Sequence, residues 1–469
     1  MTEPIPAAPI HPGGRAAPPD AFDVAVIGAG VVGCAVARRF AHAGHRVAVI
    51  EKGDDILSGA SKANSAILHT GFDAPPGSLE LACMQRGYAE YMALRDALNL
   101  PVLETGAMVV AWTPEDEARL PALAEQAHSN GVDDARLIGA DAVRAREPRL
   151  AASARAALLV PREHVIDPWS PFLAYAGEVV RRQGRFLFDT EVTGGGFDGT
   201  AWSLDVATDG AARRVRAGTV INCAGLFGDV VEARLLGAAS FAIKPRKGQF
   251  VVYDKAAAGL LTTTILPVPN ERTKGVVLCR TAFGNLLVGP TAEEQEDRGA
   301  ATVTTAELHA LMARAAAMVP ALADMPVTAV YAGLRPATEK KHYRVRHHPD
   351  RHWVTVGGIR STGLTAALGL ASHVEELVEG RPATALRPDP VAMPNLAQHR
   401  PRDWQRPGYG EIVCHCEMVT RREIEAALAG PLPPRSLGGL KRRTRAAMGR
   451  CQGFNCASAL AAIAGNRFG

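Results

Sequence analysis

Four cysteines near the C-terminus have a spacing suited to a metal centre. Cys414 and Cys416 form one close pair, Cys451 and Cys456 form a second, and 34 residues separate the two pairs. Four thiolates in so short a stretch can hold zinc or a [2Fe–2S] cluster, or can form redox-active disulfides. Zinc sites usually have about two to four residues inside each pair, so the single residue between Cys414 and Cys416 fits zinc less well. The other four cysteines lie scattered among apolar or small residues and are expected to be buried, inert thiols.

A glycine-rich turn near the N-terminus is the second candidate site. Gly28, Gly30 and Gly33 follow a short β-branched run, and a helical stretch and a second strand ending at Glu51 come after them. In such a turn the first glycine bends the chain, the second lets the backbone approach a pyrophosphate, and the third lets the helix pack on the strand. The helix N-terminus offers N–H groups to the phosphates, and Glu51 is placed to bind an adenosine ribose. The stretch predicts a dinucleotide site, for FAD or NAD.

The two candidate sites together favour one pair of cofactors. A flavin takes two electrons from a substrate and can return them singly, which NAD cannot do. An iron–sulfur cluster accepts electrons one at a time. We therefore expect FAD at the glycine turn and a [2Fe–2S] cluster at the four cysteines, with zinc or another structural role as the alternative for the cysteines.

Other segments are expected to approach the same cofactor. A small, polar loop follows Glu51, and residues 217–228 form a strand that ends in small residues and glycine. Residues 353–358 form a strand that enters a glycine turn, and a helix beginning near Leu364 gives a second helix N-terminus suited to a polar or phosphate-bearing group. The predicted cofactor-binding residues are Gly28, Gly30, Gly33, Glu51, Lys52, Ser61, Asn64, Ser65, Ala224, Gly225, Gly358, Arg360, Ser361, Thr362, Gly363, Leu364 and Thr365.

The chain divides into several regions, and the predicted class is α/β. A Rossmann-type FAD-binding domain is expected to contain an inserted antiparallel-sheet substrate domain and to precede a small C-terminal [2Fe–2S] domain. A proline- and arginine-rich stretch predicts an extended linker. The predicted regions are 1–21 (disordered leader), 22–80, 150–240 and 333–380 (FAD-binding domain), 81–149 and 241–332 (substrate domain), 381–409 (linker) and 410–469 ([2Fe–2S] domain).

Composition excludes several classes of function. The 469 residues are 47% hydrophobic and 21% charged, as in an ordinary globular protein, and the net charge of +4 does not call for a nucleic-acid partner. The chain contains no apolar run of about 18 residues, so no transmembrane helix is predicted. The first 20 residues do not resemble a secretory signal. We expect a cytoplasmic protein with reduced thiols, and peripheral association with the inner face of the membrane is compatible with this.

Several motifs in order resemble a known family. GAGVVG, SKANSAILHTGFDAPPGSLE, KGQFVVYD, GNLLVGPTAEE, GLRPAT and GGIRSTGLTA are similar to FAD-dependent dehydrogenases of the glycine oxidase/D-amino-acid oxidase superfamily. The similarity is closest to the A subunit of anaerobic glycerol-3-phosphate dehydrogenase and to L-2-hydroxyglutarate dehydrogenase. The segments IVCHCEMVT and LKRRTRAAMGRCQGFNC resemble the bacterioferritin-associated-ferredoxin-like [2Fe–2S] domain of that A subunit. The resemblance covers residues 22–469 apart from the linker.

The resemblance implies a catalytic site at two residues. In such enzymes a carbon-bound hydrogen passes as hydride to the flavin while a base takes the hydroxyl or amine proton. His69 matches a histidine near the flavin in relatives and is a candidate base, the alternative being a hydrogen bond to the cofactor or the loop. Arg335 matches an arginine that holds the substrate's anionic group, the alternative being a structural ion pair. Lys247 has no assigned role.

The implied reaction is the oxidation of a small anionic hydroxy compound. A glycerol-3-phosphate-like polyol phosphate and a 2-hydroxy acid are the leading substrates, and electrons are expected to leave through the cluster to a quinone-linked or protein acceptor. One alternative is an amine or imino-acid oxidase that reduces oxygen, and another is an electron-relay subunit of a larger complex. The basic run at residues 441–445 predicts either a solvated face, or positive charge that balances a four-thiolate cluster and docks an acidic electron-transfer partner. It lacks the aromatic platform of a nucleic-acid site.

Overall fold

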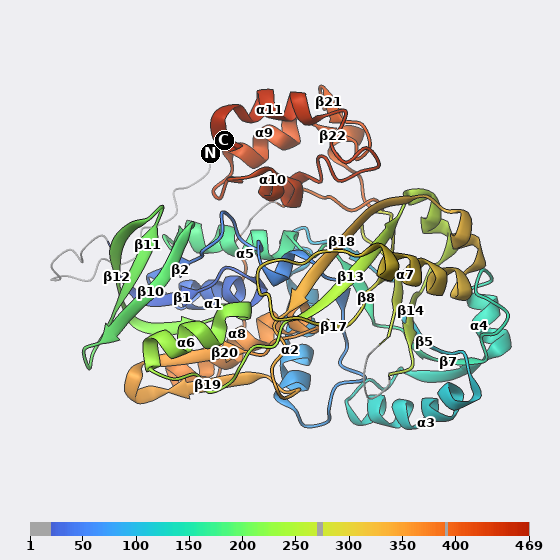
Figure 1. Ribbon diagram of the computed structural model, residues 1–469, viewed down its shortest axis with the longest axis horizontal. Coiled ribbons are helices and arrows are strands. Elements are labelled where there is room, and N and C mark those ends of the chain that lie inside the picture. Colours follow the sequence, from blue (N-terminus) through green and yellow to red (C-terminus); the bar gives the residue numbers. More distant parts are fainter. Residues whose placement is uncertain (1–19, 270–274, 390–392, 469) are drawn as a thin grey trace, which may run out of the picture.

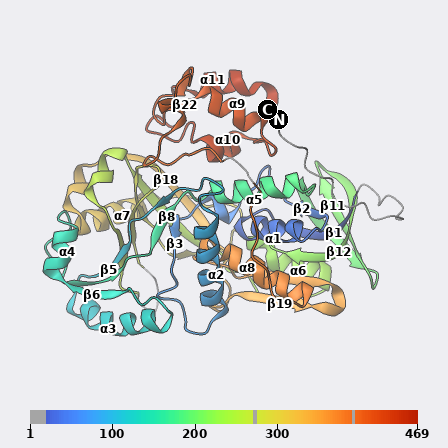
Figure 2. The same cartoon turned by 180° about the vertical axis from the view of Figure 1, so that it is seen from behind.

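The computed structural model describes residues 20–269, 275–389 and 393–468, so the predicted leader at residues 1–21 lies almost wholly outside the described residues. Figure 1 shows three parts: an eight-stranded sheet with its helices on the left, a nine-stranded sheet with its helices on the right, and a small C-terminal domain above them. Figure 2 shows the same arrangement from behind, with the C-terminal domain over the junction of the two larger parts. The predicted α/β class with a second sheet domain and a C-terminal domain is confirmed.

The first sheet is parallel where it carries the glycine turn. Strands β12, β1, β2 and β9 run parallel in that order, and β20 pairs in parallel with the last residues of β12. The first half of β12 instead pairs with β11 in an antiparallel extension. The strands are β1 (Ala21–Ile27), β2 (Val47–Ile50), β9 (Arg185–Leu187), β10 (Thr190–Phe197), β11 (Trp202–Thr208), β12 (Ala211–Asn222), β19 (Arg344–His348) and β20 (Trp353–Gly357).

Helices cover both faces of this sheet because its central strands are apolar on both sides. Val24 and Val26 of β1 pack in one core with α1, α5 and α8, while Ala25 and Ile27 pack in another with α6. This alternation is expected for a strand with a period of two between covered faces. The helices are α1 (Val31–His42), α2 (Leu79–Leu94), α5 (Ser170–Arg181), α6 (Gly228–Leu236) and α8 (Gly363–Glu379).

The second sheet is antiparallel except where β14 runs parallel to β5. Its core contains Leu311 of α7 and Val143 of α4 on one face, and Leu120 of α3 on the other. The elements are β5 (Ala107–Ala111), β6 (Arg136–Gly139), β7 (Ala156–Val160), β13 (Arg246–Tyr253), β14 (Thr264–Pro267), β15 (Val277–Arg280), β16 (Leu286–Gly289), β17 (Glu293–Glu294), β18 (Val327–Arg335), α3 (Pro114–Ser129), α4 (Ala140–Arg146) and α7 (Thr305–Met318). A three-stranded sheet of β3 (Ile67–Leu68), β8 (His164–Ile166) and β4 (Val102–Leu103) is a separate unit.

Two elements do not lie in the domain that the sequence predicted for them. Helix α2, most of which falls in residues 81–149, packs on α8 of the first part so closely that a Cβ at Gly87 would lie 2.0 Å from the Thr365 carbonyl oxygen. Strand β7, within residues 150–240, pairs with β5 and β6 of the second sheet. Apolar periodicity in a sequence identifies a helix or a strand but does not show which element it packs against. The domains to which α2 and β7 belong therefore become clear only from their packing in the structure.

The C-terminal domain has its own small core. It contains β21 (Ile412–Cys414), β22 (Val419–Thr420), α9 (Arg421–Ala429), α10 (Leu437–Thr444) and α11 (Ala457–Ala464). Helix α9 begins with a capping box, in which Thr420 Oγ1 accepts the Glu423 N–H at 3.1 Å and Glu423 accepts the Thr420 N–H at 2.9 Å. None of the helices in the described ranges has the length and apolar character needed to cross a bilayer.

The linker at residues 381–409 lies along the body of the protein. Within its described residues it contains one 3-10 turn, Asp403–Gln405, and no strand. The Gln398 N–H donates to the Ala282 carbonyl at 2.8 Å, and Asn99 Nδ2 donates to the Met393 carbonyl at 2.7 Å. These contacts fix the path by which the chain reaches the C-terminal domain.

Candidate functional site

The glycine turn has a geometry that only glycine allows. Gly28 has φ +102°, and a Cβ there would lie 2.6 Å from the Cys223 carbonyl oxygen. A Cβ at Gly33 would lie 1.9 Å from the Gly28 carbonyl oxygen, so this glycine lets α1 pack directly on the turn. Gly30 is the N-cap of α1 and provides no side-chain hydrogen bond to the helix. The first N–H groups of α1 are therefore suited to an anionic ligand.

The turn brings together several predicted cofactor residues that are distant in sequence. Ser61 Oγ accepts the Val31 N–H at 3.0 Å, and a Cβ at Gly28 would lie 3.1 Å from the Ala224 Cα. A Cβ at Gly363, the first residue of α8, would lie 3.9 Å from a methyl group of Val31. The N-termini of α1 and α8 therefore meet, and neither N-cap residue caps its helix with its own side chain, although Ser61 occupies the Val31 N–H of α1. Two adjacent helix N-termini, each with a positive dipole end, fit the pyrophosphate and the polar ring of a flavin dinucleotide.

Glu51 stabilises the turn from the end of β2. Its carboxylate accepts the Ala29 N–H at 2.7 Å and the Gly53 N–H at 2.8 Å. Burial raises the pKa of Glu51, and these two N–H groups oppose that shift. The ribose contact predicted for Glu51 remains a prediction. Lys52 lies beside the turn at Gly225–Phe227, with its Nζ 3.0 Å from the ring centre of Phe227.

The loop after Glu51 and the turn before α8 form the remaining predicted wall. In the loop, Asn64 Oδ1 accepts the Ala66 N–H at 2.8 Å. In the turn, Thr362 Oγ1 donates to Glu80 at 2.7 Å, so this side chain binds the protein. Thr365 Oγ1 accepts the backbone N–H of His69 at 3.0 Å, which ties the candidate base to α8. Among the predicted cofactor residues here, Gly225 (+54°), Gly358 (+67°) and Ser361 (+62°) have positive φ. The Ser65 carbonyl accepts a contact from Cys279 Sγ at 3.7 Å, and Leu364 is half-buried.

His69 follows β3 and has a carboxylate partner that the sequence did not reveal. Its Nδ1 lies 2.8 Å from Glu163 Oε2, and Glu163 is fully buried. Glu163 comes from the turn between β7 and β8, and β8 pairs with β3, so Leu68 lies opposite His164. The two residues are 94 positions apart in sequence, and no motif in the chain marks Glu163 as a partner.

Arg335 ends β18 as a partly buried cation. Its Nη2 donates to the Thr291 carbonyl at 3.1 Å, and none of the carboxylates in the described ranges forms an ion pair with it. A Cβ at Gly248 would lie 2.6 Å from this nitrogen, so glycine on the neighbouring strand leaves room for the guanidinium. Burial, followed by the charges of Arg246 and Arg360, lowers the pKa of Arg335 to about 10.

The three arginines come from both larger parts of the protein. Arg246 and Arg335 lie opposite one another on β13 and β18 of the second sheet, while Arg360 belongs to the turn before α8 of the first. Burial is the main cause that lowers the pKa of Arg360, and Arg246 adds to it. The junction of cofactor domain and substrate sheet therefore carries positive charge without matching negative charge at Arg335. Lys247, next to Arg246, pairs with Glu293 at 3.1 Å.

The four C-terminal cysteines gather at one place as the spacing predicts. Hydrogen-bond contacts join the side chains of Cys416 and Cys451, and likewise those of Cys414 and Cys456. Cys414 and Cys456 are buried in the domain core, while Cys416 and Cys451 are partly exposed. All eight cysteines of the chain lie in the described ranges and none is in a disulfide, and the four outside this domain are buried as predicted. Two pairs of thiols suit a two-iron cluster with two ligands on each iron.

The basic run at residues 441–445 makes buried ionic contacts that hold the cluster domain against the body of the protein. Arg443 forms a bidentate pair with Asp55, at 2.5 and 2.9 Å, and all of these atoms are buried. A Cβ at Gly439 would lie 2.0 Å from Asp55, so glycine in α10 allows the close approach. Asp55 lies in the loop shortly after β2 and Glu51, so its ion pair with Arg443 lies beside the dinucleotide turn. The run is therefore neither a solvated face nor an exposed docking surface, because its arginines face inward.

A second set of ionic contacts lies next to the cluster. Glu417, adjacent to Cys416, accepts Arg445 Nε at 2.8 Å and Lys255 Nζ at 3.3 Å. Burial alone would raise the pKa of Glu417, yet these cations hold it below its ordinary value. A cavity of about 250 Å³ between the domains is lined by Cys416, Glu417 and residues of the second sheet. The cluster site therefore faces the body of the enzyme on its Cys416 side.

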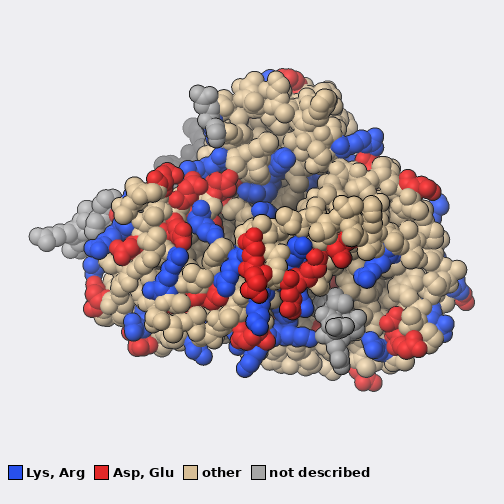
Figure 3. All heavy atoms as spheres, viewed as in Figure 1, with Lys and Arg blue, Asp and Glu red and all other residues tan. Residues whose placement is uncertain are grey.

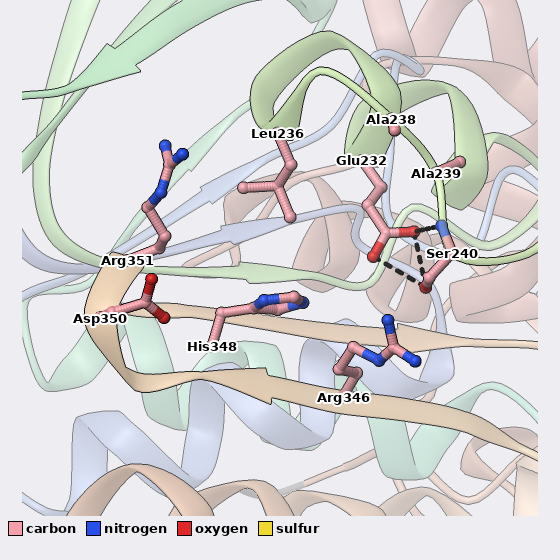
Figure 4. Close-up of a pocket in the computed structure, with 9 residues that line it drawn as sticks. All are labelled: Glu232, Leu236, Ala238, Ala239, Ser240, Arg346, His348, Asp350 and Arg351. Carbon is pink, nitrogen blue, oxygen red and sulfur yellow. Dashed lines mark hydrogen bonds between the residues drawn. The ribbon is translucent and has the colours of Figure 1, made fainter.

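Another cavity is separate from this chemistry. A cavity of about 360 Å³ lies between α6 and the β19–β20 hairpin, and Figure 4 shows Arg346, His348 and Glu232 among the side chains around it. Asp350 and Arg351 come just before β20 begins, at the amino end of that strand. The glycine turns lie at the carboxyl ends of the parallel strands, which is where such sheets bind ligands. This cavity is therefore not the dinucleotide site.

Comparison with known proteins settles the family. A family model described as FAD dependent oxidoreductase matches residues 23–377, which is most of the chain. The chain belongs to this family. A second model, described as BFD-like [2Fe-2S] binding domain, matches residues 412–465 and includes all four clustered cysteines. The protein is thus an FAD-dependent oxidoreductase that carries a [2Fe–2S] cluster, and the prediction of iron–sulfur rather than zinc is confirmed. FAD, when bound, supplies the acceptor for a hydride from substrate.

Individual relatives agree with this assignment. A glycerol 3-phosphate dehydrogenase of Caloramator mitchellensis is 30% identical over 96% of this chain and 95% of its own length. An L-2-hydroxyglutarate dehydrogenase of Caenorhabditis elegans is 28% identical over 58% of this chain and 63% of its own. The structure of L-alpha-glycerophosphate oxidase from Mycoplasma pneumoniae with FAD bound superposes with a TM-score of 0.71, covering 79% of this chain and 98% of that one at 24% identity. The predicted superfamily is confirmed.

Proposed function

We propose that this oxidoreductase dehydrogenates a small phosphorylated polyol such as glycerol 3-phosphate and passes the electrons through its [2Fe–2S] cluster to a separate acceptor. The partly buried guanidinium of Arg335, which has no carboxylate partner in the described ranges, carries this proposal. Arg246 and Arg360 act on it as like charges and lower its pKa, so an anion at this place would relieve an unfavourable arrangement. Phosphate, with nearly two negative charges near neutral pH, matches three guanidinium groups better than a single carboxylate does.

A 2-hydroxy acid is the second candidate substrate. The similarity to L-2-hydroxyglutarate dehydrogenase favours it, although that similarity covers 58% of this chain against 96% for the glycerol 3-phosphate dehydrogenase. A carboxylate would also bind the planar fork of Arg335 in a bidentate manner. In either case Arg335 binds the anion and His69 takes the hydroxyl proton, and the residues gathered at the glycine turns hold FAD.

Anaerobic mixing with candidate substrates tests this function directly. We expect glycerol 3-phosphate to bleach the flavin absorbance fully, 2-hydroxyglutarate to bleach it slowly or not at all, and the cluster signal to appear after the flavin change. Glycine, sarcosine and proline serve as comparison compounds. Bleaching by an amine together with peroxide release in air would support an amine oxidase instead and would overturn the proposal.

We also propose that the acceptor docks at the exposed side of the cluster. Phe454 lies between the ligands Cys451 and Cys456 and is 90% exposed. Residues 451–465 contain no charged side chain, and Figure 3 shows that most of the visible surface of this domain is uncharged. An exposed aromatic residue within a charge-free surface is typical of the centre of a protein interface. An electron-transfer protein or quinone-linked subunit with an apolar patch fits this surface, and a cytoplasmic location at the inner membrane face would suit it.

Replacing Phe454 by serine is expected to slow electron exit without affecting substrate oxidation. Loss of an aromatic anchor commonly weakens an interface by about 2 kcal/mol or more, roughly 30-fold in affinity. Turnover with respiratory membranes of the producing organism should therefore fall at least tenfold, while turnover with ferricyanide stays within about twofold. Tyr409→Ser, at an aromatic residue that is 38% exposed and outside residues 451–465, is the matched control. Equal loss with both acceptors would contradict this docking site.

A further inference from the structure

Glu163 is a fully buried carboxylate whose two oxygens have different partners. Oε1 accepts the backbone N–H of Thr70 and, at 2.7 Å, the Thr70 hydroxyl, while Oε2 lies 2.8 Å from Nδ1 of His69. The His69 side chain is 20% exposed, and it forms its hydrogen bond to Glu163 through Nδ1. The arrangement gives the buried carboxylate a donor at each oxygen, as such a group requires.

The contacts of Glu163 determine where the imidazole carries its proton. An ionised carboxylate can only accept hydrogen bonds, so Nδ1 of His69 must be the donor. The neutral ring then carries its proton on Nδ1, and Nε2 keeps a free lone pair. The Thr365 hydroxyl accepts the His69 backbone N–H at 3.0 Å and fixes the position from which the ring projects. The pair therefore presents Nε2 as a proton acceptor.

We propose that Glu163 is the positioning residue that keeps His69 in the tautomer needed to deprotonate the substrate, an inference that rests on the proposed dehydrogenase function. The hydroxyl proton of the substrate passes to Nε2 of His69. The hydrogen on the same carbon leaves with the electron pair of its C–H bond to FAD, and the C–O single bond becomes a carbonyl. Glu163 stays ionised, holds the Nδ1 proton and stabilises the imidazolium that forms.

Glu163→Gln tests the tautomer because it preserves size and the Thr70 contacts. With its amide oxygen facing the two Thr70 donors, glutamine turns its NH₂ group toward Nδ1 of His69. Nδ1 must then accept, which moves the ring proton to Nε2 and blocks the base. We expect kcat for flavin reduction to fall about 10- to 100-fold, as for partners that orient a functional histidine, with KM within about twofold. Glu147→Gln is the matched control, since Glu147 is equally buried and accepts the backbone N–H and hydroxyl of Thr262 away from the candidate site.

A double-mutant comparison separates positioning from a structural role. In a His69→Asn background, Glu163→Gln should change the flavin-reduction rate by less than about twofold, because its effect passes through His69. The same fold-loss in both backgrounds would show that Glu163 acts through Thr70 and the loop alone, and would overturn the proposal.

Nitrogen NMR of the holoenzyme gives a readout that needs no substrate. With ¹⁵N-labelled histidine, assigned by comparison with His69→Asn, the wild-type His69 proton should reside on Nδ1 and move to Nε2 in Glu163→Gln. An unchanged tautomer would overturn the positioning role whichever compound the enzyme oxidises. If glycerol 3-phosphate fails to bleach the flavin but the tautomer moves as expected, the proposed substrate is wrong and the role of Glu163 stands.

Discussion

Asp55→Ala is expected to uncouple substrate oxidation from electron exit. The change leaves Arg443 and Arg442, which are 7% and 9% exposed, without their buried carboxylate. Removing one partner of a buried ion pair typically costs about 3–5 kcal/mol, which would weaken docking of the cluster domain by roughly 10²- to 10³-fold. In anaerobic stopped-flow, flavin bleaching by substrate should keep its rate within about twofold, while the EPR signal of the reduced cluster should appear far more slowly or not at all.

Two further observations make this prediction specific to docking. Trypsin should cut the linker at residues 381–409 faster in Asp55→Ala, because the displaced domain no longer holds it. Arg450→Ala is the matched control: Arg450 pairs with Asp254 across the same interface at 2.8 Å, but its side chain is 72% exposed and such pairs contribute little. If the cluster is reduced at the normal rate in Asp55→Ala, the buried ion pairs of Asp55 with Arg442 and Arg443 are not required for electron transfer.

The sequence predicted those parts of the fold that depend on local pattern. Apolar periodicity and glycine chemistry predicted the β1–turn–α1 unit, which the structure contains. The cysteine spacing predicted the gathering of Cys414, Cys416, Cys451 and Cys456, because a short domain cannot place them far apart. Each of these features is decided within a few dozen residues.

Features that join distant segments could not be predicted in the same way. Asp55 and Arg443 are 388 positions apart, and nothing near Asp55 marks it as different from other loop acids. The basic run at residues 441–445 has the composition of a solvated face. In the structure its arginines are buried and pair with the carboxylates of Asp55 and Glu417, which the sequence does not reveal. The Glu163–His69 pair likewise depends on the β3–β8 register. Sequence chemistry proposes the reacting groups, whereas the groups that orient them are set by tertiary packing.

Arg335→Ala is expected to remove most of the activity by removing the site for the substrate's anion. Loss of a buried charged partner typically costs about 2–5 kcal/mol, so kcat/KM for the anionic substrate should fall between roughly 30-fold and a few thousand-fold. Arg335→Lys should recover little of this, because an ammonium group lacks the planar fork that binds phosphate at two oxygens. Arg136→Ala, at an exposed arginine of the same sheet, is the control and should keep wild-type kinetics. Wild-type activity in Arg335→Ala would overturn the anion site.

The pH dependence and the stability of Arg335 variants provide an independent check on the same site. The pKa of Arg335, near 10 without ligand, implies that substrate binding weakens as pH rises through about 10, where the guanidinium begins to lose its proton. If the substrate is a phosphate, kcat/KM should also decline below about pH 6, where the dianion takes up a proton, whereas a carboxylate substrate would show no such limb. Because the folded pKa lies below the ordinary value, the charged group destabilises the fold at every pH below about 10. Arg335→Leu should therefore melt at a higher temperature than wild type while losing activity, and added substrate should raise the melting temperature of the wild type alone. A lower melting temperature in Arg335→Leu would instead mean that Arg335 is a structural residue.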